Sequence, residues 1–145
     1  MKGRILFILI LVLGLAAIFT YDYFRFFDGR LHVVFCSVGQ GDAILLRTPK
    51  GKAILIDSGP NEKVVACLER HLPFWKRNID LFVLSHPHAD HYLGIYYVID
   101  RYVIRQFATE KLMNKQNTFQ KVLKKLEEKA QAQYLYQGDE FKTSD

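Results

Sequence analysis

The sequence predicts a mixed α/β domain that follows a single membrane-spanning helix. An unbroken apolar run comes first, hairpin-forming strands come next, and helices then alternate with strands. Hairpin strands followed by alternating helices and strands favour a mixed sheet with helices on its outer face. The 145 residues are enough for one modest domain and an appendage. A net charge of +5 permits partners such as nucleic acid or anionic lipid without requiring either.

The apolar run predicts a transmembrane helix. It extends from Ile5 to Phe19, and with two further residues it reaches the length of about 17 residues that a helix needs to cross a bilayer. Lys2 and Arg4 precede it, and an aromatic cluster follows it, as in the belt that marks a membrane interface. We therefore assign residues 1–21 to a transmembrane signal anchor and residues 22–30 to a linker.

A cleaved signal peptide and a buried core helix are the two alternatives for this run. The small residues Ala16 and Ala17 are followed by Ile18 and Phe19, which makes a poor cleavage site. A core helix would carry a polar face, and this segment has none. Basic residues before the span place the N-terminus in the cytoplasm. We therefore expect a single-pass protein of the inner (cytoplasmic) membrane with an extracytoplasmic domain.

Residues 31–145 are predicted to form the domain. Short segments rich in Val, Ile, Leu and Phe predict strands at 31–36, 43–48, 52–57, 80–85 and 103–108. Helical spacing of apolar residues predicts helices at 61–71, 92–101 and 118–133. Asn61 is a candidate cap for the first helix. Residues 134–136 and 140–141 could pair as two strands around Gly138 and Asp139. Cys36 and Cys67 are interpreted as buried apolar side chains rather than a disulfide pair.

Chemistry is concentrated in a loop after the strand at 80–85. Three of the five histidines, His86, His88 and His91, lie there with Asp90. Imidazole nitrogens and a carboxylate suit zinc, with manganese or iron as alternatives. One such loop could hold two ions that share an acidified water, as in two-metal hydrolysis. The alternative is a solvated surface loop, but clustering of ligand-type residues after a buried strand favours a metal site.

Three motifs carry a resemblance to a known family. The loop S-H-P-H-A-D-H resembles the H-x-H-x-D-H signature of the metallo-β-lactamase superfamily. With V-G-Q-G-D-A-I-L-L at 38–46 and I-L-I-D-S-G-P at 54–60, the stretch at 80–94 resembles the hydrolase domain of ComEC-type competence proteins. Those are membrane proteins of DNA uptake. The resemblance implies a metallo-β-lactamase-like αββα sandwich, of which this chain holds the N-terminal portion.

The resemblance also implies roles for single residues. His86 and His88 would hold one divalent ion, and Asp90 and His91 the other, with Asp90 also the candidate catalytic residue. Asp57 would lie beneath the site and orient a ligand histidine, or alternatively cap a turn. Gly39 and Gly41 would permit a tight turn near the metals, or form an ordinary hairpin-type pair.

The chain departs from the family pattern in two respects. Ser37 stands where the family often has aspartate. The superfamily domain also continues further and supplies additional histidines and a bridging aspartate, and neither His32 nor His71 is expected to replace them. We therefore expect a domain truncated at its C-terminus, an exposed apolar sheet face, and a missing C-terminal half or partner chain.

Two functions follow from these patterns. The first is a membrane-anchored metal-dependent hydrolase, phosphodiesterase-like or nuclease-like, related to DNA uptake. A lactonase or β-lactamase activity would use the same metals. The second is a catalytically incomplete module without activity of its own. A lysine-rich stretch could contact DNA phosphates, although its charge pattern favours a solvated helix face. It contains Lys111, Lys115, Lys121, Lys124, Lys125 and Lys129.

Overall fold

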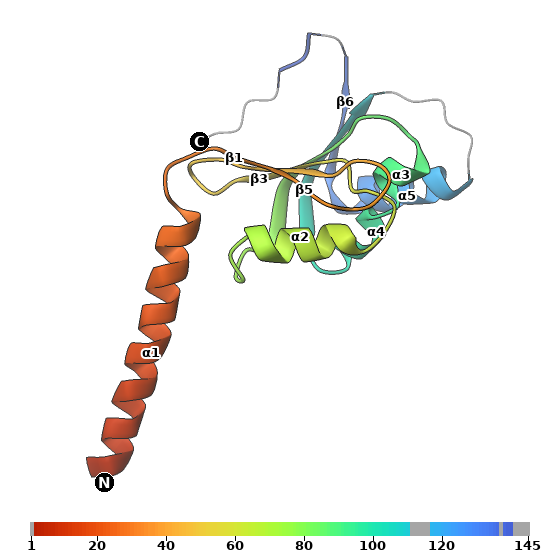
Figure 1. Cartoon of the computed structure of the whole chain (residues 1–145). Helices are drawn as coiled ribbons and strands as arrows, with labels where there is room; N and C mark the ends of the chain where they lie inside the picture. Colours follow the sequence, from red (N-terminus) through yellow and green to blue (C-terminus); the bar gives the residue numbers. More distant parts are fainter. Residues whose placement is uncertain (1, 111–116, 137, 141–145) are drawn as a thin grey trace.

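The computed structural model describes residues 2–110, 117–136 and 138–140 (Figure 1). Along the chain, the elements are α1 (Lys2–Phe26), β1 (His32–Phe35), β2 (Ile44–Arg47), β3 (Ala53–Ile56), α2 (Lys63–His71), β4 (Asn78–Leu84), α3 (Ala89–Tyr92), α4 (Ile95–Ile99), β5 (Val103–Glu110), α5 (Asn117–Lys129) and β6 (Gln131–Leu135). The predicted mixed α/β architecture is confirmed.

The strands form one mixed sheet in the order β1-β2-β3-β4-β5-β6. The first three strands are antiparallel neighbours, whereas β3, β4, β5 and β6 pair in parallel. Parallel neighbours need a crossover connection, and α2 supplies it between β3 and β4. The carboxyl ends of β3 and β4 therefore lie at the same edge of the sheet.

The core lies between this sheet and the helices on one of its faces. Leu45, Leu55, Phe82 and Phe107 are paired in register across the four central strands, and all are buried. The apolar sides of α2, α4 and α5 belong to the same buried cluster, and Figure 1 shows these helices on one side of the sheet. Burial of such side chains contributes about 1.5–3 kcal/mol each.

The other face of the sheet is apolar, and it is exposed at the edge formed by β1. Val33 and Phe35 in β1 are 49% and 77% exposed. Ile44, Ile56 and Val83 continue the row of Phe35 across the next strands and are only partly covered. Among the described residues no second sheet covers this face. The expected exposed apolar face is thus present.

Three expected elements after β4 differ from the prediction. The helix expected at 92–101 is divided into α3 and α4, because Gly94 lies against the backbone of Ser58 and its N–H donates to the Gly59 carbonyl at 2.8 Å. The helix expected to reach residue 133 ends at Lys129, because residues 131–135 pair in parallel with β5. Residues 134–136 were expected to pair with 140–141. This prediction was wrong for residue 140, because β6 pairs with β5 and residue 140 lies in no strand. Phe141 lies outside the described residues.

The segment expected to be a linker is partly helical. α1 continues to Phe26, and Phe27 N–H still donates to the Tyr23 carbonyl at 2.9 Å. Phe26 is buried against the domain at 7% exposure. Sequence composition marked the end of the apolar run, but the helix continues because its last turn is packed on the domain.

The two cysteines form a disulfide, and the interpretation as independent buried side chains was wrong. Cys36 follows β1 and Cys67 lies on α2, with Cα atoms 5.7 Å apart. Both side chains are partly exposed rather than buried. Their separation of 31 residues carries no indication of proximity; only the packing of α2 across the end of β1 brings them together.

Candidate metal centre

The predicted site residues lie at the edge where β3 and β4 end. Asp57 directly follows β3, and Ser85 and His86 directly follow β4. The loop then turns into α3, which carries Asp90 and His91. Because the two strands are parallel neighbours, their carboxyl ends bring Asp57 next to the histidine loop.

Asp57 and His91 form the buried base of the centre. They are 3% and 8% exposed, and His91 Nδ1 lies 2.9 Å from Asp57 Oδ2. A carboxylate at Nδ1 holds that nitrogen protonated, which leaves Nε2 as the nitrogen able to bind a metal. Asp57 has a left-handed φ of 55°, which aspartate tolerates better than most residues. The predicted orienting role of Asp57 fits this geometry.

Ser85 links the same carboxylate to a second histidine. The Ser85 hydroxyl donates to Asp57 Oδ2 at 2.6 Å, and the Ser85 N–H donates to Oδ1 at 2.8 Å. The Ser85 hydroxyl oxygen lies 2.9 Å from His86 Nδ1. It can accept a hydrogen bond from an Nδ1–H, because its own hydrogen is donated to Asp57. Ser85 therefore orients His86 as Asp57 orients His91. The sequence analysis missed this role, although Ser85 stands directly before the first histidine.

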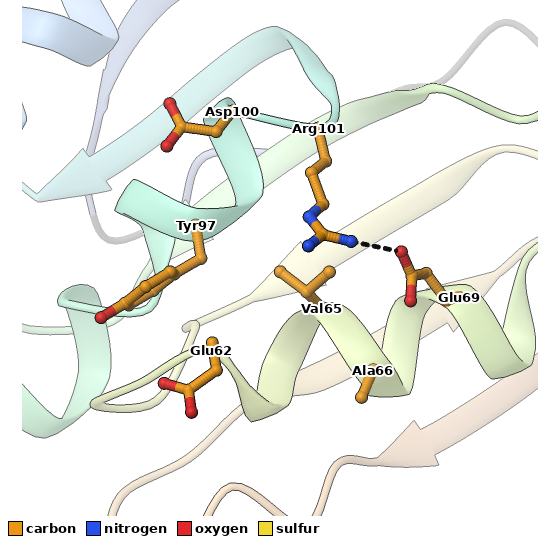
Figure 2. A pocket seen from close by; sticks show the side chains of 7 residues that line it. All are labelled: Glu62, Val65, Ala66, Glu69, Tyr97, Asp100 and Arg101. Carbon is orange, nitrogen blue, oxygen red and sulfur yellow. Dashed lines mark hydrogen bonds and ion pairs between the residues drawn. The ribbon is translucent and has the colours of Figure 1, made fainter.

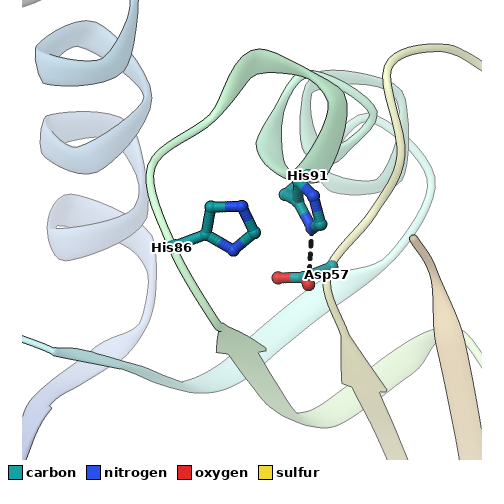
Figure 3. Close-up of side chains that lie close together, drawn as sticks. All are labelled: Asp57, His86 and His91. Atoms are coloured by element: carbon teal, nitrogen blue, oxygen red, sulfur yellow. Dashed lines mark hydrogen bonds and ion pairs between the residues drawn. The ribbon is translucent and has the colours of Figure 1, made fainter. Parts of the chain in front are cut away.

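The side chains of the loop converge. Asp57, His86 and His91 form a group whose ligand-type atoms all lie within 4.8 Å of one another, and this group could hold a metal ion (Figure 3). The His86 ring centroid lies 3.9 Å from that of His91 and 4.7 Å from that of His88. Asp90 Oδ2 lies 3.7 Å from His91 Nε2. His88 thus lies beside His86, and Asp90 beside His91, but neither belongs to the group of three.

Asp57 is better placed to position ligands than to bind an ion. Both of its oxygens already accept hydrogen bonds, from Ser85 and from His91. His88 and Asp90 are more accessible, and the Asp90 side chain is 46% exposed. Imidazole and carboxylate donors at these positions suit zinc, manganese or iron, so the donor set fits the divalent ions that the sequence predicts.

Backbone contacts hold the histidine loop against the segments 38–46 and 54–60. A Cβ on Gly41, whose φ is +83°, would lie 2.0 Å from the Asp90 carbonyl oxygen. The His91 carbonyl accepts hydrogen bonds from the Ser58 N–H at 2.7 Å and from its hydroxyl at 3.1 Å. The predicted glycine turn near the metals is therefore present, and at Gly41 it is required by close approach.

The other two histidines lie away from this centre. His32 Nε2 lies 2.9 Å from Asp28, and this hydrogen bond lowers the pKa of the Asp28 carboxyl. His71 ends α2, where burial first, and then the charge of Arg70, lower its pKa. Neither belongs to the group of possible ligands formed by Asp57, His86 and His91.

The surface of the domain has a separate hollow between α2 and α4 (Figure 2). It has a volume of about 470 Å³, and Glu62, Glu69, Asp100, Arg101 and Tyr97 are among its lining residues. Arg101 donates to Glu69 Oε1 at 2.8 Å. None of the lining residues belongs to the histidine loop, so this hollow is not part of the candidate centre.

The lysines of α5 match the interpretation as a solvated helix face. Lys124 Nζ lies 3.9 Å from Glu128, and Lys125 Nζ lies 3.8 Å from Asp100. Exposed pairs of this kind contribute little to stability. Lys111 and Lys115, which were included in the candidate DNA contact, lie outside the described residues.

Comparison with known proteins supports the fold. The family model described as the metallo-beta-lactamase superfamily matches residues 36–142. A diphosphatase of the PhnP family matches with a TM-score of 0.50 and 17% sequence identity, over 73% of this chain and 50% of that one. At this low identity the likeness concerns the fold alone. No curated protein matches the chain.

Two further solved structures share more sequence but less overall geometry. A HARLDQ-motif mutant of a metallo-beta-lactamase from Cronobacter sakazakii has 27% identity and a TM-score of 0.43, over 55% of this chain and 31% of that one. A subclass B3 metallo-beta-lactamase from a soil metagenome library has 27% identity and a TM-score of 0.43, over 57% and 31%. This chain thus spans between 31% and 50% of the length of these three structures.

Proposed function

This chain belongs to the metallo-β-lactamase superfamily, and from that premise we propose that it is a membrane-anchored, metal-dependent hydrolase of the phosphodiesterase or nuclease type. Members of this superfamily are hydrolases. The observation that carries the proposal is the group of Asp57, His86 and His91 that could hold a metal ion, with His88 beside His86 and Asp90 beside His91. Asp57 and Ser85 hold two of the histidine rings.

In the proposed mechanism, His86 and His88 would hold one divalent ion, and Asp90 and His91 would hold the other. Such ions would supply Lewis-acid chemistry and lower the pKa of a coordinated water to about 7. Asp57 and Ser85 orient the rings of His91 and His86, which leaves Nε2 of each ring as the metal-binding nitrogen. Asp90, whose side chain is partly open to solvent, is the group that can accept a proton close to the substrate.

The substrate class rests on the resemblance of three motifs. The segments 38–46, 54–60 and 80–94 resemble the hydrolase domain of ComEC-type competence proteins, which supports DNA as the substrate. A lactonase or β-lactamase activity would use the same ligands. The link to DNA uptake stays a prediction.

The membrane part of the proposal rests on α1 and on the disulfide. α1 is a helix of 25 residues that is long and apolar enough to cross a bilayer. Lys2 and Arg4 at its start favour a cytoplasmic N-terminus. Disulfides such as Cys36–Cys67 persist in oxidising compartments outside the cytoplasm. We therefore place the domain on the extracytoplasmic side of the inner membrane.

Protease protection tests this orientation. In right-side-out spheroplasts, added protease should digest the domain without lysis. Digestion only after lysis would place the domain in the cytoplasm and would contradict the proposed topology.

A catalytically incomplete module is the second candidate function. It is favoured by the apolar sheet face at the β1 edge, where Val33 and Phe35 are exposed. Two ligands for each ion also bind more weakly than three or four. A C-terminal half or a partner chain that covers this face would then be needed for activity.

The deciding experiment is metal analysis of the whole chain in detergent, followed by an assay with a phosphodiester. Zinc or manganese content after dialysis should fall in His91→Ala and His88→Ala but not in the matched control His32→Ala, because His32 lies outside the loop. Hydrolysis of bis(para-nitrophenyl) phosphate should follow metal content. Metal binding without hydrolysis would favour the incomplete module, and equal metal in all four proteins would refute the metal centre itself.

A further inference from the structure

The end of α1 is fixed to the domain by contacts on two sides. Arg47 lies over the Phe26 ring at 5.1 Å, and its Nη1 donates to the His71 carbonyl at 2.9 Å. Phe27 packs against Gly51 so closely that a Cβ there would lie 2.5 Å from its ring. The helix therefore cannot rotate freely against the β2–β3 turn and the end of α2.

A third contact lies further back along the helix. The Phe19 ring stacks on Trp75 at a centroid distance of 4.5 Å and meets Phe74 edge to face at 6.5 Å. Phe19 is the last residue of the apolar run, and it precedes Phe26 by seven residues, or about 10 Å along a helix. The loop between α2 and β4 thus reaches back to the level where the apolar part of α1 ends; Figure 1 shows this loop on the side facing α1.

The composition of this loop suits a lipid interface. Phe74 is 59% exposed, Trp75 is partly exposed and Arg77 is exposed. Tryptophan and phenylalanine beside a basic residue match the preferences of the headgroup region, where an aromatic ring is buried and a cation meets lipid phosphate. Exposed aromatic rings beside an apolar helix indicate a surface that is covered in the working protein.

We propose that the loop between α2 and β4 is a second membrane contact, in which Phe74 and Trp75 enter the headgroup interface of the bilayer that α1 spans. This inference rests on the membrane anchoring in the proposed function. The loop precedes β4, whereas the histidine loop follows it. β4 has seven residues, or about 20 Å of extended chain. The membrane contact therefore directs the metal centre away from the bilayer, towards substrates in the aqueous compartment.

The chain contains a single tryptophan, Trp75, so its intrinsic fluorescence reports on this loop alone. The full chain is reconstituted into vesicles of phosphatidylcholine and phosphatidylglycerol that contain phosphatidylcholine brominated at different depths. Trp75 should emit at a shorter wavelength in the vesicles than it does in the denatured chain in detergent-free buffer. Its emission should also fall with bromolipids, more with bromines near the carbonyl end of the acyl chain than with bromines near the bilayer centre.

Two variants in a Trp75→Phe background serve as matched controls. Tyr136→Trp places the probe after β6, at the end of the parallel strands that carries the metal centre, on a side chain that is 61% exposed. Its emission should be unaffected by bromolipid. Tyr21→Trp places the probe on α1 itself, at a position 68% exposed, and its emission should be quenched.

The outcomes separate the two proposals. Quenching of Tyr21→Trp without quenching of Trp75 would overturn the loop contact and leave the membrane anchor in place. Such a result would indicate that the rings are covered by protein instead. Absence of quenching in both would overturn the anchor and the loop contact together. Quenching of Tyr136→Trp to the same extent as Trp75 would also refute the proposed orientation.

Discussion

At the scale of single residues, one carboxylate organises the candidate centre. Asp57 accepts hydrogen bonds from His91, from the Ser85 hydroxyl and from the Ser85 N–H. Through Ser85 it also sets the orientation of His86. Two metal-binding rings on different parts of the loop therefore depend on a residue that need not touch a metal. Partners of this kind affect metal affinity almost as strongly as the ligands.

The substitution Asp57→Asn should lower metal affinity about 10–100-fold without removing a ligand. An amide nitrogen cannot accept a hydrogen bond, so the amide loses either the bond from the Ser85 N–H at Oδ1 or both bonds, from the Ser85 hydroxyl and from His91, at Oδ2. Either loss weakens the contacts that orient the two rings. Competition with a chromogenic chelator measures the affinity. Asp28→Asn is the matched control, because Asp28 forms a histidine–carboxylate pair outside the histidine loop, with His32. Equal affinity in both variants would show that Asp57 only closes a turn.

At the scale of elements, the centre depends on loops that approach one another closely. The turn before β2 touches α3 through Gly41 and the Asp90 carbonyl. The strand ends supply Asp57 and Ser85, and α2 is fixed to β1 by the disulfide. These contacts hold the side chains of the histidine loop more firmly than the short helix α3 could by itself.

Gly41→Ala should destabilise the domain by about 1–3 kcal/mol, because the added methyl group meets backbone that cannot move aside cheaply. It should also lower metal content by displacing Asp90. The control is Gly29→Ala. Gly29 has a similar φ of +73°, but a Cβ there would meet nothing within 4 Å. Urea unfolding in detergent gives the free energies; similar losses for both variants would mean that backbone conformation, not the contact with Asp90, decides.

Reduction of Cys36–Cys67 should lower the free energy of unfolding by about 3–4 kcal/mol, the chain-entropy value for a loop of this length. The bond closes a separation of 31 residues. Urea unfolding with and without reductant measures the difference. The double variant Cys36→Ser, Cys67→Ser should unfold like the reduced protein and should not respond to reductant. Unchanged stability on reduction would show that packing of α2 alone holds this edge.

At the scale of the whole molecule, the two ends of the parallel strands have separate tasks. The amino ends face α1. Asp80, near the amino end of β4, connects β4 to β3 and to the loop before β4. It accepts hydrogen bonds from Lys76 Nζ at 2.6 Å, Ala53 N–H at 2.8 Å and Asn78 Nδ2 at 3.0 Å. Burial alone would raise the pKa of Asp80, but the hydrogen bonds from Lys76 and Ala53 outweigh it and hold that pKa below its usual value.

Because the pKa of Asp80 is lower in the folded state than in the unfolded state, its ionised form stabilises the fold at pH values above the ordinary pKa. This stabilisation should be lost as the pH falls from about 4 through the lower pKa of the folded state. Asp80→Asn should cost about 1–3 kcal/mol at neutral pH and flatten the acid limb of the stability profile. Urea unfolding at a series of pH values measures both effects. An acid limb as steep as that of the unmodified protein would assign the acid sensitivity to other carboxylates.

Local patterns were enough for much of this protein. The apolar run, the strands of alternating apolar residues and the histidine loop after a buried strand each follow from residues close in sequence. The clustering of His86, His88, Asp90 and His91 predicted a metal site, and the ligand role of each residue stays a prediction. Such features depend on the period of a helix or strand and on ligand chemistry, which a sequence carries directly.

Contacts between distant segments were decided only by the tertiary structure. The sequence did not indicate that Cys36 meets Cys67, that Ser85 links Asp57 to His86, or that Trp75 stacks on Phe19. It also placed a linker where the last turn of α1 is packed on the domain. These pairs arise from the strand order and from the packing of helices across the sheet. Because that arrangement depends on the whole core at once, no single segment specifies it.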